Sequence, residues 1–250
     1  MERTIGIERG WFIICNGSVV PAIDELLPVL WREAKKKRWR KERFGWELFA
    51  GQLEERTPPA SSIEELVGYL KENFELMETV CGSLGFQLIC KDFVEEKDLG
   101  ELLVNPFDKR HEKIWSRISE KRRVAASQVA AIHVHVSTNS EEAVKILSYC
   151  RREIVDRLCA LGDFSCGRRL RSYKEMAQVS GEPPVFTSFE EILNYIDEHG
   201  GERNVWDLVR YKPFSTETIE FRMFGATTDI KIIEKIIQAC MKVVEDALAV

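Results

Sequence analysis

Two stretches decide the fold: Ala131-Ile132-His133-Val134-His135-Val136 and Thr218-Ile219-Glu220-Phe221-Arg222-Met223. Successive side chains of a β-strand point to opposite faces, so the alternation in both stretches predicts a strand with one apolar face. The other face carries imidazoles in the first strand, at His133 and His135, and a charged pair in the second, at Glu220 and Arg222. Polar groups on a strand that should bury itself point to a site.

Two further segments place polar groups in the same way. Residues 5–15 alternate, carry the carboxylate of Glu8 and end at an Asn-Gly turn signal. Residues 46–56 form another expected strand, which puts Gln52, Glu54 and Arg56 on one side. If the four strands pair in one sheet, their polar faces merge into a single concave surface.

Such a surface would offer hard oxygen ligands suited to Mg²⁺ or Mn²⁺ from Glu8, Glu54 and Glu220. Arg222 would supply a cation for an anionic group beside them. Two alternatives stay open at this point. The polar faces could simply be solvated, with Glu220 and Arg222 as an exposed ion pair. The two histidines could also belong to a zinc site, although no third ligand stands in a tight motif.

The rest of the chain mixes helices with strands. Apolar spacing predicts helices over 21–41, 63–80, 140–158 and 229–248, and shorter ones within 105–121 and from about 188. A short strand is expected over 86–90, and the arginine-rich residues 166–171 are expected to form a loop. Neither G-x-G-x-x-G nor a Walker loop occurs, which argues against Rossmann and P-loop folds. We therefore expect one α+β domain over residues 1–250, built around a mainly antiparallel sheet.

Composition restricts the class of protein. The 250 residues are 44% hydrophobic with a formal net charge of −5, which excludes a disordered chain and a generally cationic nucleic-acid binder. No apolar run approaches the roughly 18 residues of a membrane span, and the N-terminal residues lack a signal-peptide layout. Seven cysteines without a C-x-x-C motif suit reduced thiols, so we expect a cytoplasmic protein. The basic run 35–43 could contact RNA but is more simply a solvated helix end.

Six motifs follow one another along the chain: Gly6-Ile7-Glu8, the segment from Glu47 to Glu54 with Thr57-Pro58, Asn105-Pro106-Phe107, His133-Val134-His135-Val136, Arg169-Leu170 before Pro183-Pro184, and Trp206-Asp207-Leu208 with Arg210, Lys212 and Thr218 to Arg222. In this order they resemble the carboxylate–amine ligases of the glutamate–cysteine ligase family 2 type, which are related to glutamine synthetase and the guanido kinases. The resemblance spans about residues 4 to 248. It implies a curved sheet with helices packed on its outer face, like the catalytic domain of glutamine synthetase.

The resemblance also implies a reaction. A carboxylate attacks the γ-phosphate of ATP to give an acyl phosphate, and an amine then displaces phosphate to form an amide. The chemistry depends on metal ions and protein cations around the transferring group. By the resemblance, the metal ligands for Mg²⁺ or Mn²⁺ are Glu8, Glu54 and Glu220, the ATP contacts are His133, His135 and Lys212, and the cations on the phosphoryl group are Arg222, Arg169 and Arg210.

One position departs from the family pattern. Its opening strand carries a second glutamate two residues after the first, and this chain has Gly10 there. The alternative is therefore a catalytically inactive protein on the same fold that binds a nucleotide or metabolite. The expected partners are a small-molecule carboxylate and an amine, without membrane or nucleic acid. Which two molecules are joined is not readable, a glutamate–cysteine ligase-like reaction is one option, and a homo-oligomer stays open.

Overall fold

The computed structural model describes residues 3–250; Met1 and Glu2 of the expected domain 1–250 lie outside the described residues. The strands are β1 Ile5–Cys15, β2 Ser18–Val19, β3 Phe44–Trp46, β4 Gln52–Arg56, β5 Gln87–Ile89, β6 Ala131–Ser137, β7 Val209–Lys212 and β8 Thr218–Gly225. The α-helices are α1 Ile23–Lys36, α2 Ile63–Leu84, α3 Lys109–Arg117, α4 Glu120–Ser127, α5 Ser140–Tyr149, α6 Arg152–Leu161, α7 Arg168–Ala177, α8 Phe189–Glu198 and α9 Ile230–Ala249. Short 3₁₀ turns lie at η1 Lys41–Arg43, η2 Glu96–Asp98 and η3 Glu202–Asn204.

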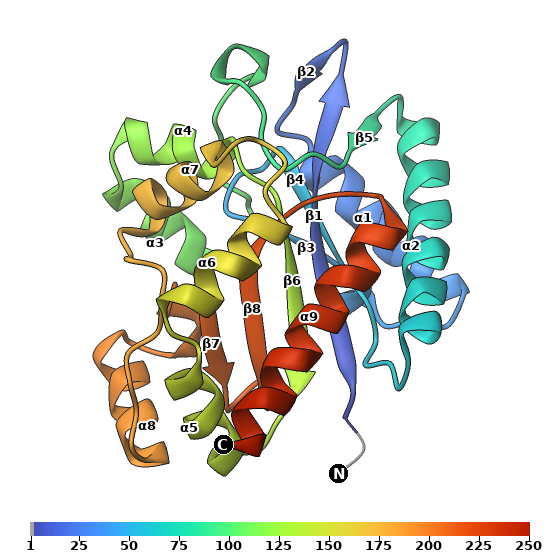
Figure 1. Ribbon diagram of the computed structural model, residues 1–250. Helices are drawn as coiled ribbons and strands as arrows, with labels where there is room; N and C mark the ends of the chain where they lie inside the picture. Colours follow the sequence, from blue (N-terminus) through green and yellow to red (C-terminus); the bar gives the residue numbers. More distant parts are fainter. Residues whose placement is uncertain (1–2) are drawn as a thin grey trace.

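The strands form one sheet in the order β3-β4-β1-β6-β8-β7, and β2 and β5 also pair with β1 (Figure 1). These strand pairings are antiparallel. The expected α+β class with a mainly antiparallel sheet is confirmed. The register sets residues of the predicted polar faces opposite one another: Glu8 with His133, Gly10 with Glu54, His135 with Glu220, and Arg210 with Glu220.

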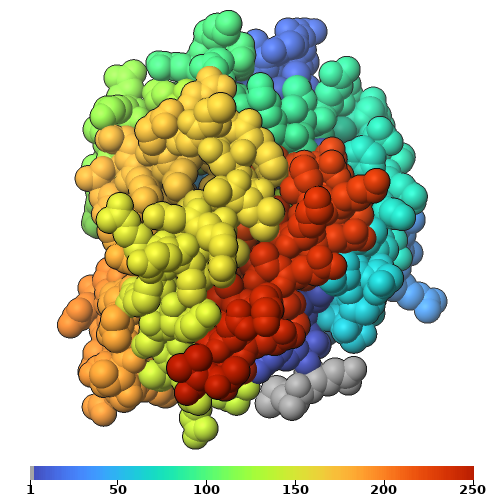
Figure 2. All heavy atoms as spheres, viewed as in Figure 1, coloured from blue at the N-terminus to red at the C-terminus, as the bar shows by residue number. Residues whose placement is uncertain are grey.

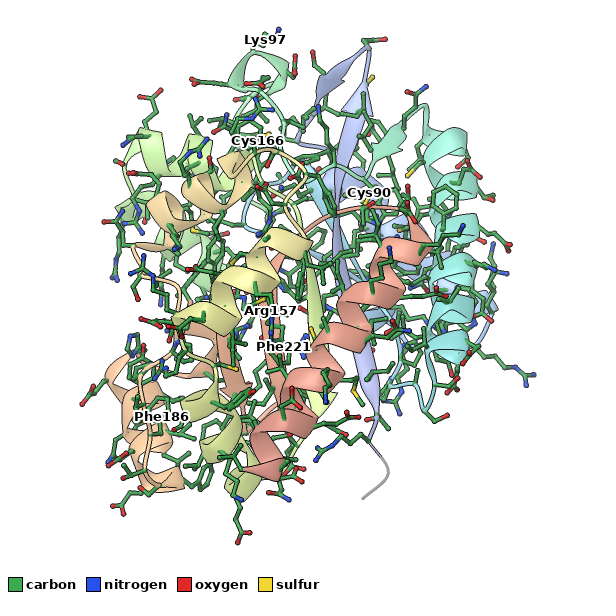
Figure 3. The ribbon with its side chains drawn as sticks, in the orientation of Figure 1. Cys90, Lys97, Arg157, Cys166, Phe186 and Phe221 are labelled. Carbon is green, nitrogen blue, oxygen red and sulfur yellow. The ribbon has the colours of Figure 1, made fainter. Side chains whose placement is uncertain are left out.

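Helices α2, α5, α6 and α9 pack on the outer face of the sheet, and α1 contacts β3 and β4. Figure 2 shows α6 and α9 lying across this face. The predicted apolar faces of the strands supply the core beneath them, with Ile7, Val134 and Phe221 fully or almost fully buried. Phe221 on β8 is labelled between α6 and α9 in Figure 3. Burying this apolar face leaves the polar face of the same strands on the inner side of the sheet.

Local signals place the ends of the long helix α2. The Ser62 hydroxyl accepts a hydrogen bond from the Glu65 backbone N–H, as an N-cap does, and Glu64 and Glu65 fall in the first turn. Gly85 ends the helix in the left-handed conformation, with φ 78°. None of the helices formed by residues 3–250 combines the length and apolarity that a bilayer crossing requires.

Three sequence predictions are wrong in detail. The strand expected over 46–56 is interrupted, because residues 47–51 leave the sheet between β3 and β4. The helix expected over 140–158 is two helices that meet at Cys150, where ψ is 64°. Residues 168–171 are helical rather than a loop, since α7 buries Arg169, Tyr173 and Met176 on one side. Because the first of these buried positions is Arg169 and not an apolar residue, the sequence does not show the apolar spacing of a helix here.

Candidate functional site

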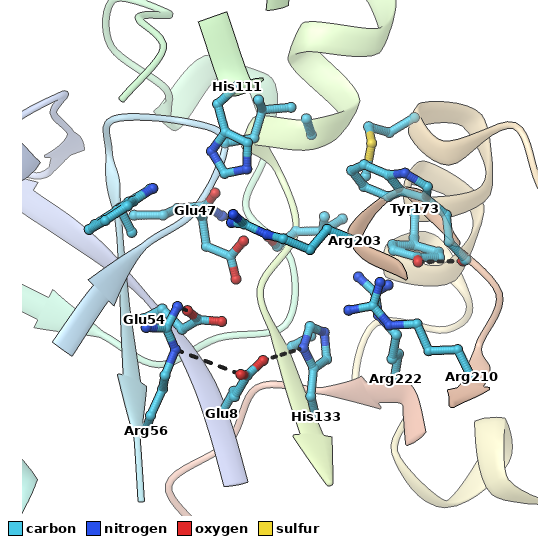
Figure 4. Close-up of a pocket in the computed structure, with 18 of the residues that line it drawn as sticks. Glu8, Glu47, Glu54, Arg56, His111, His133, Tyr173, Arg203, Arg210 and Arg222 are labelled. Atoms are coloured by element: carbon cyan, nitrogen blue, oxygen red, sulfur yellow. Dashed lines mark hydrogen bonds and ion pairs between the residues drawn. The ribbon is translucent and has the colours of Figure 1, made fainter. Parts of the chain in front are cut away.

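A pocket opens on the polar side of the sheet, between the strands and helices α3, α4 and α7 (Figure 4). Seven of the predicted site residues line it: Glu8, Glu54, His133, Arg169, Arg210, Lys212 and Arg222. The other two, His135 and Glu220, do not line the pocket, and both side chains are buried. In Figure 4, Glu54 and Arg56 lie on one side of the pocket and Arg210 and Arg222 on the other.

Three of these side chains gather in one cluster that could hold a metal ion. His133 Nδ1 lies 3.3 Å from Glu8 Oε2 and 3.3 Å from Glu220 Oε1. One ligand atom from each residue lies within 4.8 Å of the other two, a spacing that a single ion can bridge. Glu220 Oε1 is buried and receives no hydrogen bond from any described residue. The two carboxylates are hard oxygen ligands of the kind that Mn²⁺ and Mg²⁺ prefer, and the imidazole adds a nitrogen ligand.

The protonation states of the cluster suit a cation. Burial alone would raise the pKa of Glu8, but the imidazoles of His135 and His133 and the Arg56 guanidinium hold it well below its usual range. Burial lowers the pKa of His133 to about 4, so its imidazole is neutral near pH 7. A neutral imidazole beside ionised carboxylates can donate a lone pair to a metal.

Glu220 is held between two arginines. Arg210 Nε donates to Glu220 Oε2 at 2.5 Å, and Arg222 Nε lies 3.5 Å from Glu220 Oε1. Burial would raise the pKa of this carboxyl, but Arg210 and Arg222 hold it well below its usual range. The same guanidiniums line the pocket, so they balance a buried carboxylate and also face any anion that enters.

Arg169 lies in the pocket wall with its donors already engaged. Its Nε donates to Ala130 O at 3.2 Å, Nη1 to Met223 O at 2.8 Å and Nη2 to Arg222 O at 3.0 Å. These bonds tie α7 to β8 and to the residue before β6. The side chain is 3% exposed, which leaves it poorly placed to bind an anion directly.

His135 lies deeper than expected. Its Nδ1 is 3.0 Å from Thr218 Oγ1, and its Nε2 is 3.6 Å from Glu8 Oε2 and has no hydrogen-bond partner among the described residues. It therefore supports Glu8 from beside the cluster. Lys212, at the end of β7, is half-buried and lines the pocket.

Other polar residues of the pocket were not singled out from the sequence. Glu47 lies in the loop between β3 and β4, and burial and the neighbouring Glu8 raise its pKa to about 7. Strand alternation could not find it, although it is the first residue of the motif from Glu47 to Glu54. Arg110 and His111 come from α3 and Arg203 from η3, where no strand period exists to mark them.

No protein-family model and no curated protein sequence matches this chain. Solved structures do match its fold. A bifunctional glutathione synthetase from Pasteurella multocida shares 15% identity at a TM-score of 0.61, over 99% of this chain and 40% of that one. Glutamate–cysteine ligase from Francisella tularensis, solved in complex with AMP, shares 10% identity at 0.57, over 98% of this chain and 67% of that one. A glutamine synthetase from Plasmodium falciparum shares 12% identity at 0.50, over 98% and 52%.

These identities establish likeness of fold. The expected architecture, similar to the catalytic domain of glutamine synthetase, is confirmed. The chain spans less than half of the glutathione synthetase and about two thirds of the glutamate–cysteine ligase.

Proposed function

We propose that this protein is an ATP-dependent carboxylate–amine ligase of the glutamate–cysteine ligase family 2 type, which forms an amide through an acyl phosphate. The observation that carries the proposal is the cluster of Glu8, His133 and Glu220 with Arg210 and Arg222 in one pocket. The sheet that presents it has the fold of ligases, one of which was solved with AMP. ATP with Mg²⁺ or Mn²⁺ is the proposed cofactor pair.

The metal ligands would be Glu8, His133 and Glu220. The unpartnered Oε1 of Glu220 and the close approach of the three ligand atoms favour this set. A bound ion would supply positive charge beside the phosphates of ATP. Glu47 and Glu54 are further carboxylates of the same pocket.

The proposed reaction depends mainly on positively charged groups around the transferring phosphoryl group. As a substrate carboxylate oxygen bonds to the γ-phosphorus and ADP leaves, charge spreads over the transferring phosphoryl oxygens. Arg222, Arg210 and Lys212 would face this charge from β7 and β8. Arg169 would act as a positioning residue, because its donors hold the carbonyl groups of Met223 and Arg222. The amine nitrogen then bonds to the acyl carbon, and phosphate leaves.

A second candidate is a nucleotide- or metabolite-binding protein that no longer turns over. Gly10 favours it, since this residue lies opposite Glu54 and offers no carboxylate to the pocket. A Cβ at this position would lie 3.1 Å from Ala130 Cβ, so a longer side chain would need Ala130 to move. For the ligase, the proposed substrates are a small carboxylate and an amine. A homo-oligomer and a cytoplasmic location are proposed together with the ligase activity.

Trapping of the acyl phosphate tests the proposal. The protein would be mixed with MgATP or MnATP, a panel of amino acids and other small carboxylates, and hydroxylamine as the nucleophile. We expect hydroxamate and ADP to form in equal amounts with at least one carboxylate. Glu8→Gln should abolish both products, while Glu78→Gln, on the exposed side of α2, should keep them. Nucleotide binding without hydroxamate or ADP across the panel would favour the inactive candidate.

A further inference from the structure

A protein cation already stands between two carboxylates of the pocket. The guanidinium of Arg56 pairs with Glu54 Oε2, and its Nε lies 3.7 Å from Glu8 Oε1. Figure 4 shows Arg56 reaching across from β4 toward Glu8 on β1. Both carboxylates were expected to hold metal, so Arg56 occupies space that a second ion would need.

The position of this guanidinium is shaped by a glycine. A Cβ at Gly45 of β3 would lie 2.7 Å from Arg56 Nη2 and 2.8 Å from both Cζ and Nη1. The three distances are nearly equal, so the flat face of the guanidinium rests on Gly45. A side chain at position 45 would therefore displace the guanidinium from this contact, which lies beside Glu54, the register partner of Gly45.

The Glu54 side of the pocket differs from the metal-type cluster in having an arginine on its carboxylate. Within residues 3–250, the metal-type cluster consists of Glu8, His133 and Glu220, and it leaves out Glu54. An arginine keeps its charge at any pH in which the protein is folded. The guanidinium already occupies Glu54 Oε2, so a divalent ion bound to this carboxylate would have to displace it. The glycine at position 10, opposite Glu54, adds no further ligand on that side.

We infer that Arg56 is a built-in cation which takes the place of a second metal, so that the pocket binds one divalent ion, at Glu8, His133 and Glu220. The inference rests on the proposed function, because it specifies how the same site neutralises its carboxylates. In this arrangement Gly45 leaves room for the guanidinium of Arg56, and the guanidinium limits the pocket to one divalent ion.

Counting ions tests the inference without nucleotide or turnover. The full chain would be titrated with Mn²⁺, with free Mn²⁺ followed by electron paramagnetic resonance. We expect one tight ion per chain for the wild type and for Arg56→Lys, which keeps the charge. Arg56→Gln should bind two, because Glu54 and Glu8 lose their protein cation. Gly45→Ala should also admit a second ion by displacing the guanidinium. Its control, Gly68→Ala, has open space at the new methyl group and should bind one.

Two tight ions in the wild type, or one in both folded Arg56→Gln and Gly45→Ala, would overturn the inference. Circular dichroism would establish that each variant is folded, and Gly45→Ala decides the matter if Arg56→Gln is not. No tight ion in the wild type would overturn both the inference and the proposed metal site. One ion without hydroxamate formation would instead fail the ligase proposal alone.

Discussion

Arg210 and Glu220 face each other across β7 and β8, and Arg210 Nε donates to Glu220 Oε2 at 2.5 Å with the carboxylate fully buried. The remaining Arg210 bonds go to the carbonyl groups of Glu202 and Val205. Arg210 lines the pocket, so this pair holds one of the pocket's cations in place. It also keeps Glu220 ionised, which a metal ligand requires.

Replacing Glu220 by Gln should therefore destabilise the fold as well as the site. The change leaves two buried guanidiniums, those of Arg210 and Arg222, without their counter-charge. We expect the free energy of unfolding to fall by about 3–5 kcal/mol, measured by urea denaturation. The exposed control Glu78→Gln should change it by no more than about 0.5 kcal/mol. A loss below about 1 kcal/mol in Glu220→Gln would contradict the role of the buried pair.

Arg169 should not tolerate lysine. Three carbonyl oxygens accept from its guanidinium, and a single ammonium on a flexible stem cannot reproduce that fork. We expect Arg169→Lys to lower the free energy of unfolding by about 2–4 kcal/mol, because each buried acceptor left unpaired costs about 1–3 kcal/mol.

Arg171→Lys is the matched control, since Arg171 lies on the same helix and is exposed. Urea denaturation of the two variants in parallel makes the comparison. Equal stability of Arg169→Lys and Arg171→Lys would show that Arg169 does not tie α7 to β8.

His111 should make the fold sensitive to acid. Burial and the neighbouring Arg110 lower its pKa to about 4, against about 6.5 in an unfolded chain. Between these values the unfolded chain binds more protons, so stability is complete above about pH 6.5 and falls as the pH drops toward 4. The expected loss from this residue is on the order of 3 kcal/mol.

Unfolding free energies of His111→Gln, measured from pH 4 to 7, should depend less steeply on pH than those of the wild type. His199→Gln, at an exposed position, should keep the wild-type slope. An unchanged slope in His111→Gln would rule out His111 as the source of acid sensitivity.

Gly162 should resist even a methyl group. A Cβ there would lie 2.8 Å from the Phe224 Cα, which is backbone and cannot swing away. We expect Gly162→Ala to cost about 1–3 kcal/mol of stability, as overpacking does. Gly82→Ala in α2 meets nothing within 4 Å and should instead stabilise the helix by up to about 1 kcal/mol. Thermal unfolding of both variants would separate them, and a neutral Gly162→Ala would contradict the close approach of α6 to β8.

Strand alternation was the most informative pattern in the sequence. It assigned His133 and His135 to one face and Val134 to the other, and the approach of both imidazoles to Glu8 confirms this division. Two-residue periodicity is a strong signal because a shift of one residue would turn every apolar group out of the core. Arg9 of β1 is buried against Glu55 of β4, a pairing that no local pattern could reveal.

The rest of the site depends on the way distant segments fold together. Glu47 reaches the pocket from a loop, and Arg110 and Arg203 reach it from a helix and a 3₁₀ turn. Arg169 was expected to hold an anion, and its hydrogen bonds give it a place in the framework instead. Which donors of a side chain remain free is decided by tertiary contacts, and sequence spacing does not contain that information.

Calorimetric titration of MgATP into the wild type, Glu8→Gln and Glu78→Gln tests the central claim most directly. It requires no knowledge of the carboxylate or the amine. The proposed site predicts saturable binding that depends on the metal ion, weakened about tenfold or more in Glu8→Gln and unchanged in Glu78→Gln. Absence of binding in the wild type, or equal affinity in Glu8→Gln, would contradict a nucleotide site on this face of the sheet.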